Sequence, residues 1–312
     1  MNIELYKPLT FQGIGRKENQ EDNFYLDPEN RFFILCDGMG GHADGEVASK
    51  TVCGALSDFF HTNKTENFEV SEDYINRAVE FAYQALDAKD EEENEIKKMG
   101  TTLTLVYFGN NGVMTAYIGD SRVYQIRPSD KGNPIKIKTF DHSYVNALVA
   151  TGQITPEEAR THPKRNIVTK CMQPHSDRDM PDFYSENVRM GDYFFLCSDG
   201  ILENITDEIL CQVLAENISE DEKIKKLEEQ CKGKTRDNYT CILLKIKDLE
   251  FPKIKLSLYE NEDSDDEILE TQTIEPEPEK SVAENRPSEK KAENFLSSVK
   301  DFVSSLIKRN EL

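Results

Sequence analysis

Short runs of apolar residues recur through the first 249 residues and predict buried β-strands. The runs RFFILC and YFFLC contain no alternating polar positions, which is typical of strands covered on both faces. The segments TTLTLVYF and VMTAYI flank the turn sequence at residues 109–112 and predict an antiparallel hairpin. Three further strand patterns follow along the chain: RVYQIR, IKIKTF and YTCILLKI. Together these patterns predict a largely antiparallel sheet system.

Helical periodicity separates several of these strands. One helix is expected after His42 through Phe60, and another from Ser71 to about Lys89. The stretches Thr155–Glu158 and Ser219–Glu222 have the spacing of a capping box and predict two more helix starts. The simplest architecture is an α+β fold in which helices cover the sheets.

The composition changes after Leu249 and predicts a tail beyond a folded domain of residues 1–249. From Glu260 to Glu279 there are ten acids and no Lys or Arg, so residues 250–293 are expected to form a disordered linker. Residues 294–310 place apolar side chains at helical spacing and predict an amphipathic helix. Packing back on the domain and docking to a partner are both open for this helix, whereas its few basic residues disfavour a membrane surface.

The formal net charge of −21 over 312 residues restricts the partners of the chain. This charge argues against nucleic acid or an anionic membrane surface as the main partner, because a phosphate backbone is held by clustered Lys and Arg. A divalent cation, by contrast, is favoured by an acidic protein.

Cysteine usage and the N-terminal segment bear on the cellular location. The seven cysteines are scattered without a C-x-x-C pair, which predicts reduced thiols. The first residues lack a basic region followed by an apolar one, and no apolar run approaches the ~20 residues of a membrane span. A cytoplasmic protein without a transmembrane segment is therefore expected.

The segment FFILCDGMGGHADG, residues 32–45, permits three interpretations. Asp37-Gly38 is a hairpin-turn signal, but a helical pattern follows it where a second strand would be needed. The stretch GMGGHA matches a dinucleotide-binding turn, which requires a parallel βαβ unit and an acid at the end of a second strand. Asp58 lies near the expected offset but on the predicted helix. Both interpretations are therefore disfavoured.

Acids beside other predicted strands favour the third interpretation, a metal site. YFFLCSDG places Asp199 after a strand as FFILCDG places Asp37. Asp120 also follows a strand, and Asp237 precedes one. Acids that converge without Lys or Arg between them repel one another, and hard divalent ions relieve that repulsion. Carboxylates, a backbone carbonyl and water suit Mg²⁺ or Mn²⁺.

Seven short motifs occur in a fixed order between residues 10 and 247. They are GIGRKENQEDN, CDGMGGHADGEVAS, GTTLT, YIGDSRVY, DHS with EEARTHPKRNIVT, CSDGI and RDNYT. This series resembles the motifs of metal-dependent serine/threonine protein phosphatases of the PPM family, type 2C, in its compact bacterial form. The resemblance implies a central antiparallel β-sandwich flanked by helices in αββα layers, with a metal centre at one end. It also implies that about residues 141–174 form a flap that shapes substrate choice.

The resemblance assigns the first metal ligands position by position. Asp37 would bridge two ions, and the Gly38 carbonyl would hold one of them. Asp199 and Asp237 would complete the first site. The implied cofactors are Mn²⁺ or Mg²⁺, two ions with a third, more weakly bound ion as in many members.

The remaining site residues follow from the same motifs. Glu21, through water, and Asp22 would lie near the second ion, and Asp120 would hold the third. Arg16 would bind the substrate phosphate, because a guanidinium matches phosphate oxygens bidentately. Asn238 would support the site.

The implied reaction is hydrolysis of phosphoserine and phosphothreonine in proteins. Two ions ~3.5–4 Å apart would activate a bridging hydroxide for attack on phosphorus in line with the leaving oxygen. Many animal members have a His directly after the Asp-Gly, but Met39 stands there, and His42 cannot inherit the role. The acid that protonates the leaving alcohol is therefore unassigned.

Two alternatives remain open at the level of sequence. One is a pseudophosphatase that binds phosphoproteins as a scaffold, and the other is a hydrolase of small phosphate esters on the same site. A scaffold would be expected to lose a metal acid, yet Asp37, Asp199, Asp237 and Glu21 are present. The expected partners are phosphoproteins and an opposing serine/threonine kinase, and the chain is expected to be a monomer.

Overall fold

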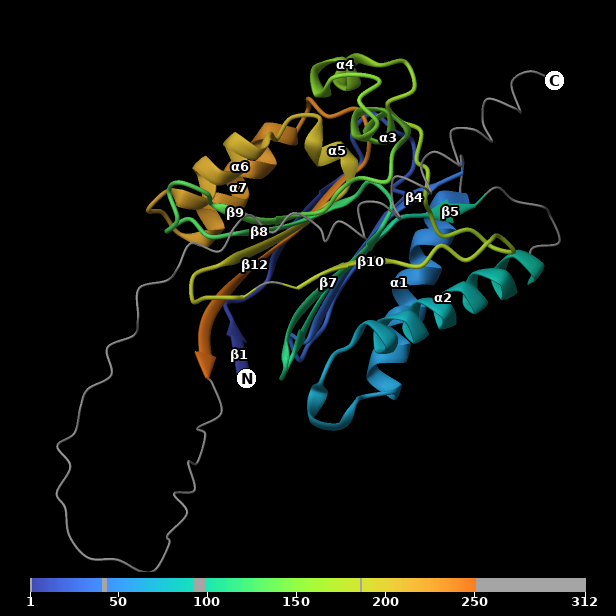
Figure 1. Ribbon diagram of the computed structural model, residues 1–312, viewed down its shortest axis with the longest axis horizontal. Helices are drawn as coiled ribbons and strands as arrows, with labels where there is room; N and C mark the ends of the chain where they lie inside the picture. Colours follow the sequence, from blue (N-terminus) through green and yellow to red (C-terminus); the bar gives the residue numbers. More distant parts are fainter. Residues whose placement is uncertain (1, 41–43, 93–98, 186, 251–312) are drawn as a thin grey trace, which may run out of the picture. The chain divides into compact units, whose positions relative to one another are not determined.

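The computed structural model describes residues 2–40, 44–92, 99–185 and 187–250, with two antiparallel sheets at its centre (Figure 1). The strands of the first sheet are β1 (Asn2–Leu5), β2 (Leu9–Gly13), β8 (Arg122–Ile126), β9 (Ile135–Lys138), β11 (Tyr193–Cys197) and β12 (Tyr239–Glu250). Their order is β1-β12-β11-β8-β9, and β2 pairs with the first half of β12. The strand β12 therefore lies between β11 on one side and β1 and β2 on the other.

The second sheet has the order β10-β7-β6-β4-β3, with β5 also on β4. Its strands are β3 (Asp22–Leu26), β4 (Phe32–Met39), β5 (Gly100–Thr101), β6 (Leu103–Gly109), β7 (Gly112–Ile118) and β10 (Asp182–Tyr184). The predicted hairpin is confirmed, since Gly109 pairs with Gly112 in the β6–β7 register. All pairs among the described strands of both sheets are antiparallel, which argues against the parallel unit of a dinucleotide-binding turn.

The two sheets pack face to face over an apolar core. Phe33 and Leu35 of β4 and Phe194 and Leu196 of β11 belong to one buried cluster between the sheets. The rings of Phe108 and Phe194 meet edge to face with their centroids 5.4 Å apart. Alternate residues of β4 point the other way, which explains why its sequence is apolar without interruption. The predicted sandwich is confirmed.

Helices cover the outer faces of both sheets (Figure 1). The helices are α1 (Asp44–Thr62), α2 (Glu72–Glu92), α3 (Tyr144–Ala150), α4 (Pro156–Thr161), α5 (Asp199–Leu202), α6 (Asp207–Ala215) and α7 (Glu220–Cys231), with a short 3₁₀ turn at Glu66–Phe68. Ile34 of β4 shares a buried cluster with Leu56 of α1. On the opposite side, Phe195 of β11 shares one with Leu227 of α7. This arrangement is the expected αββα order of layers.

Several boundaries differ from the sequence-based expectations. Asp37 lies inside β4 rather than at its end, and Asp199 begins α5 directly after the Ser198 cap. Both predicted capping boxes are present, at Thr155–Glu158 and Ser219–Glu222.

The expected linker and amphipathic helix, residues 250–293 and 294–310, lie outside the described residues except for Glu250, the end of β12. Within the described part of the chain, no helix has the length and apolar character that a membrane span requires.

Candidate metal centre

Two adjacent strands bring the first pair of predicted ligands together. In the antiparallel β3–β4 register, Asp22 lies directly opposite Asp37. Asp22 is only 4% exposed, and its Oδ2 accepts a hydrogen bond from Ser198 Oγ at 2.8 Å. Its Oδ1 is buried and has no hydrogen-bond partner. A buried carboxylate oxygen without a donor is costly unless a proton or a cation compensates it.

Three further acids converge on Asp37 from separate elements. Asp199 begins α5, Asp120 lies in the turn between β7 and β8, and Asp237 lies two residues before the start of β12. Burial raises the pKa of Asp37 well above its ordinary value, and the charges of Asp22, Asp199, Asp120 and Asp237 raise it further. The structure therefore gathers the five predicted aspartates into one repelling cluster.

The pKa values of Asp22, Asp120 and Asp199 are shifted in the same direction. Burial, followed by the charges of Asp120 and Asp237, raises the pKa of Asp199 well above its usual range. Burial also raises the pKa of Asp22 to about 6 and that of Asp120 to about 7. Such shifts mean that the cluster binds positive charge, whether from protons or from metal ions.

Backbone contacts fix the position of Asp37. Its N–H donates to Thr102 Oγ1 at 2.9 Å, and its carbonyl accepts from Thr101 Oγ1 at 2.9 Å. The next residue must be glycine, because a Cβ on Gly38 would lie 2.1 Å from the Gly45 carbonyl oxygen. The close approach of β4 to the start of α1 thus leaves no room for a side chain beside Asp37.

Glu21 lies at the rim of the same cluster. Its carboxylate experiences the charges of Lys17, Asp237, Asp44 and Glu46, and burial raises its pKa. Its backbone carbonyl accepts from Gly38 N at 3.1 Å. Glu21 therefore lies within electrostatic reach of the cluster.

The loop that carries Arg16 packs on the segment that carries Asp237. Arg16 N donates to the Arg236 carbonyl at 2.9 Å, and Gly15 adopts a φ of +64°. A Cβ on Gly15 would lie 2.1 Å from the Asp237 carbonyl oxygen, so only glycine permits this contact. The Arg16 side chain is exposed, as a residue that receives substrate would be.

Lys17 corrects one sequence-based expectation. The converging acids were expected to have no Lys or Arg among them, but Lys17 Nζ lies 2.8 Å from Asp237 Oδ1. The pairing was missed because it depends on a turn that folds residue 17 against a segment more than 200 residues later. The only local indication was the sequence Gly15-Arg16-Lys17, which shows a nearby positive charge but not its partner.

The donor set fits a hard divalent ion, with several carboxylates and an unpartnered buried oxygen on Asp22. As the side chains stand, no three Asp, Glu, His or Cys residues within the described segments are arranged to hold an ion. Two of the acids are engaged elsewhere, Asp22 by Ser198 and Asp237 by Lys17. Rotation of these side chains would be part of metal binding. His42 falls outside the described residues.

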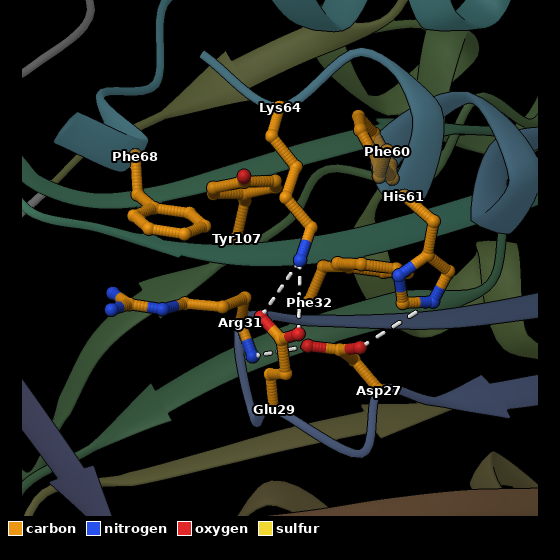
Figure 2. A pocket seen from close by; sticks show the side chains of 9 residues that line it. All are labelled: Asp27, Glu29, Arg31, Phe32, Phe60, His61, Lys64, Phe68 and Tyr107. Atoms are coloured by element: carbon orange, nitrogen blue, oxygen red, sulfur yellow. Dashed lines mark hydrogen bonds and ion pairs between the residues drawn. The ribbon is translucent and has the colours of Figure 1, made fainter. Parts of the chain in front are cut away.

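A separate small pocket lies toward the other end of β4 (Figure 2). It borders Phe32, about 17 Å along the strand from Asp37 at ~3.3 Å per residue. Asp27 is 2% exposed there, and its Oδ1 lies 3.6 Å from His61 Nε2. The cavity volume of about 10 Å³ suits about one water molecule, so the pocket is no substrate site as it stands.

Comparisons with known proteins point to one family. Residues 13–238 match the family model described as protein phosphatase 2C. PstP, a serine/threonine protein phosphatase of Mycobacterium tuberculosis, is 32% identical over 264 residues, 85% of this chain and 49% of its own length. PhpP, a protein phosphatase of Streptococcus pneumoniae, is 34% identical over 70% of this chain and 86% of its own length. The chain thus spans about half the length of PstP.

Solved structures give the same result for the fold. The crystal structure of the M. tuberculosis phosphatase PstP aligns with a TM-score of 0.69 at 32% identity, over 78% of this chain and 100% of the other. Phosphatase Stp1 from Staphylococcus aureus aligns with the same TM-score at 34% identity, over 78% of this chain and 95% of the other. A structure of the PstP catalytic domain in complex with two manganese ions aligns with a TM-score of 0.65 at 32% identity, covering 78% and 99%.

Proposed function

Since the chain belongs to the protein phosphatase 2C family, we propose that it hydrolyses phosphoserine and phosphothreonine in proteins with the help of divalent metal ions. The observation that carries this proposal is the cluster of five aspartates whose charges repel one another, with one buried oxygen of Asp22 unpartnered. Such a cluster needs a compensating cation, and the exposed Arg16 stands on the loop beside it.

The ligands of the ions are proposed from the same geometry. Asp37 would be shared by two ions and the Gly38 carbonyl would hold one of them. Asp199 and Asp237 would complete the first site, and Glu21 and Asp22 would lie near the second ion. A third, weaker ion would take Asp120. Divalent ions in such a centre supply an activated water near neutral pH and balance the charge of the phosphoryl group. Manganese is favoured over magnesium by the two manganese ions in the similar PstP catalytic domain.

The protein side chains orient the substrate. Arg16 would hold two phosphate oxygens with its guanidinium and so place phosphorus above the aspartates. Asn238, which is 2% exposed, accepts from Glu21 N at 2.8 Å and donates to the Ile14 carbonyl at 2.9 Å. It therefore joins the Arg16 loop to the metal-ligand segments and acts as a positioning residue.

The binding partners of the chain are proposed from its family membership. The substrates would be phosphoproteins, and the opposing enzyme a serine/threonine kinase. The flap at 141–174, a monomeric state and docking through residues 294–310 stay predictions from the sequence.

The test uses a phosphothreonine peptide with Mn²⁺, with EDTA, and with Asp199→Asn. Turnover should require Mn²⁺, and the substitution should lower it by about a thousandfold, because loss of a ligand removes several kcal/mol of charge stabilisation. Asp73→Asn is the matched control, since Asp73 is 85% exposed on α2. Activity that survives both chelation and Asp199→Asn would sink the proposal.

A further inference from the structure

Lys17 lies among the acids that are proposed to hold the ions. Its Nζ is 2.8 Å from Asp237 Oδ1, and the two side chains are 46% and 38% exposed. The charges of Glu21 and Asp37 also act on the ammonium group. Burial disfavours the charged form of Lys17, but the hydrogen bond to Asp237 and these charges outweigh it and raise its pKa.

Backbone hydrogen bonds fix the position of the Lys17 main chain relative to Asp237. The turn at Gly15 closes with Lys17 N donating to the Ile14 carbonyl at 3.3 Å, and Arg16 N is fixed to Arg236. Asn238 ties Ile14 and Asn19 to the same segment. The base of the Lys17 side chain is therefore held beside Asp237, while its four-carbon stem can swing.

The oxygen that Lys17 contacts is already fully engaged. Asp237 Oδ1 accepts from Lys17 Nζ and also from Asn238 N at 2.8 Å. A divalent ion on the same carboxylate would place two cations against each other, and like charges at such separations repel strongly. Ion and ammonium therefore compete for Asp237.

We propose that Lys17 is an exchangeable cation of this centre, which holds Asp237 until a divalent ion displaces it and then turns toward the substrate phosphate beside Arg16. The proposal rests on the proposed function in taking Asp237 as a metal ligand and a phosphate ester as substrate. It makes two separate claims: Lys17 weakens metal binding, and displaced Lys17 strengthens phosphate binding.

The first claim is tested by calorimetric titration of the full chain with Mn²⁺. Lys17→Met should bind Mn²⁺ about threefold to fivefold more tightly than the unmodified chain, the upper part of the range for an exposed ion pair. The gain should shrink at higher salt because exposed charges are screened. Lys17→Arg keeps the charge and should stay within about twofold of the unmodified chain.

Lys247→Met is the matched control for the loss of one positive charge. Lys247 is 47% exposed, close to the value for Lys17, and pairs with Glu4. It lies about 30 Å along β12 from Asp237 at ~3.3 Å per residue. Its Mn²⁺ affinity should be unchanged. Equal effects of the two Met variants, or no tightening in Lys17→Met, would overturn the first claim.

The second claim is tested with inorganic phosphate added to the Mn²⁺-loaded chain, again by calorimetry. Lys17→Met should bind phosphate at least about threefold more weakly, and Lys17→Arg should restore most of the affinity. Phosphate binding that is equal in Lys17→Met and the unmodified chain would overturn this claim.

Neither titration depends on turnover, so the two proposals can fail separately. A chain that binds Mn²⁺ and responds to Lys17→Met, but hydrolyses no phosphopeptide, would overturn the proposed function alone. A chain that binds no Mn²⁺ would overturn both.

Discussion

Asn238 makes more contacts within the candidate centre than its small size suggests. Its Oδ1 accepts from Glu21 N at 2.8 Å, and its Nδ2 donates to the carbonyls of Ile14 at 2.9 Å and Asn19 at 3.0 Å. With only 2% of the residue exposed, water cannot replace these partners. One amide thus fixes the segments on both sides of the Arg16 loop.

Substitution of Asn238 should therefore affect stability and substrate binding together. Asn238→Ala should lower the free energy of unfolding by about 2–3 kcal/mol, because three partly buried hydrogen bonds to the backbone are lost. It should also raise KM for a phosphopeptide, since the Arg16 loop is released. Urea unfolding and steady-state kinetics measure the two effects.

Asn133 provides the comparison, because it is exposed in the turn before β9. Asn133→Ala should change the free energy of unfolding by about 0.5 kcal/mol or less. A loss in Asn238→Ala no larger than this would contradict the proposed bridging role.

Individual site residues could be predicted only where short motifs carry them. The acids at Asp37, Asp120, Asp199 and Asp237 were visible because each stands next to an apolar strand pattern. The contacts of Asn238 and Lys17 were not visible, since they join loops far apart in the sequence. Nothing local in an Asp-Asn or Arg-Lys pair reports which distant backbone it will touch.

At the scale of elements, His142 connects the segment after β9 to β7 and β10. Its Nδ1 accepts from Gly119 N at 2.9 Å, so Nε2 carries the proton and donates to Asp182 Oδ2 at 2.8 Å. The ring is 6% exposed and stacks on Tyr117 with centroids 4.9 Å apart. This side chain therefore holds the start of the predicted flap against the turn that carries Asp120.

The interaction of Asp182 on β10 with His142 and Lys170 should make the stability of the chain depend on pH. Burial alone would raise the pKa of Asp182, but the hydrogen bond from His142 and the charge of Lys170 lower it to about 2. A lowered folded pKa contributes stability above the unfolded value of ~3.9, and this stability is lost as the pH falls toward 2. Since the side chain is 48% exposed, the contribution is about 1 kcal/mol or less.

Asp182→Asn isolates this contribution from that of the other acids. Urea unfolding at pH 6 should show the unmodified chain as more stable than the variant, and about half of the difference should be gone at pH 3, midway between the two pKa values. A difference that stays constant between pH 6 and pH 3 would show that the charge of Asp182 is not responsible.

Long helices and helices with capping boxes could be predicted from the sequence, whereas several short strands could not. The helix expected from Ser71 to Lys89 is α2, Glu72–Glu92, because its apolar face repeats over several turns. The short strands β1, β3 and β10 were not predicted, as segments such as DFY show no alternation. Their strand conformation depends on partners elsewhere in the chain, and a local pattern does not contain that information.

For the whole molecule, the clustered aspartates should link stability to pH and, if they hold the proposed ions, to metal. Acids whose folded pKa is raised, such as Asp22 at about 6 and Asp120 at about 7, favour folding at low pH. That contribution is lost as the pH rises through these values. The metal-free chain should therefore be less stable at pH 7.5 than at pH 5.5.

Manganese should reverse this trend, because the ion replaces the protons. With free Mn²⁺ at about 100 times its dissociation constant, the gain is about 2.7 kcal/mol, or roughly 5–10 °C in Tm at pH 7.5. The gain should be smaller at pH 5.5, and Asp37→Asn should remove most of it. Thermal unfolding with EDTA and with Mn²⁺ at both pH values measures this, and an equal gain at both would exclude the linkage.

The pairing of β12 with β2 also has a consequence for synthesis of the protein. Tyr239 pairs with Gly13 at the edge of the centre, and the loop with Arg16 lacks its contacts to Arg236 and Asn238 until residues 236–243 have been made. At roughly 5–20 residues per second, the ribosome needs on the order of 10–50 s to bridge that interval. During this time β1 and β2 lack their partner strand β12. Unpaired strand edges of this kind are prone to aggregation and are bound by chaperones. The proposed metal centre is therefore completed only after almost the entire domain has been translated, and any activity that depends on it would appear in one late step.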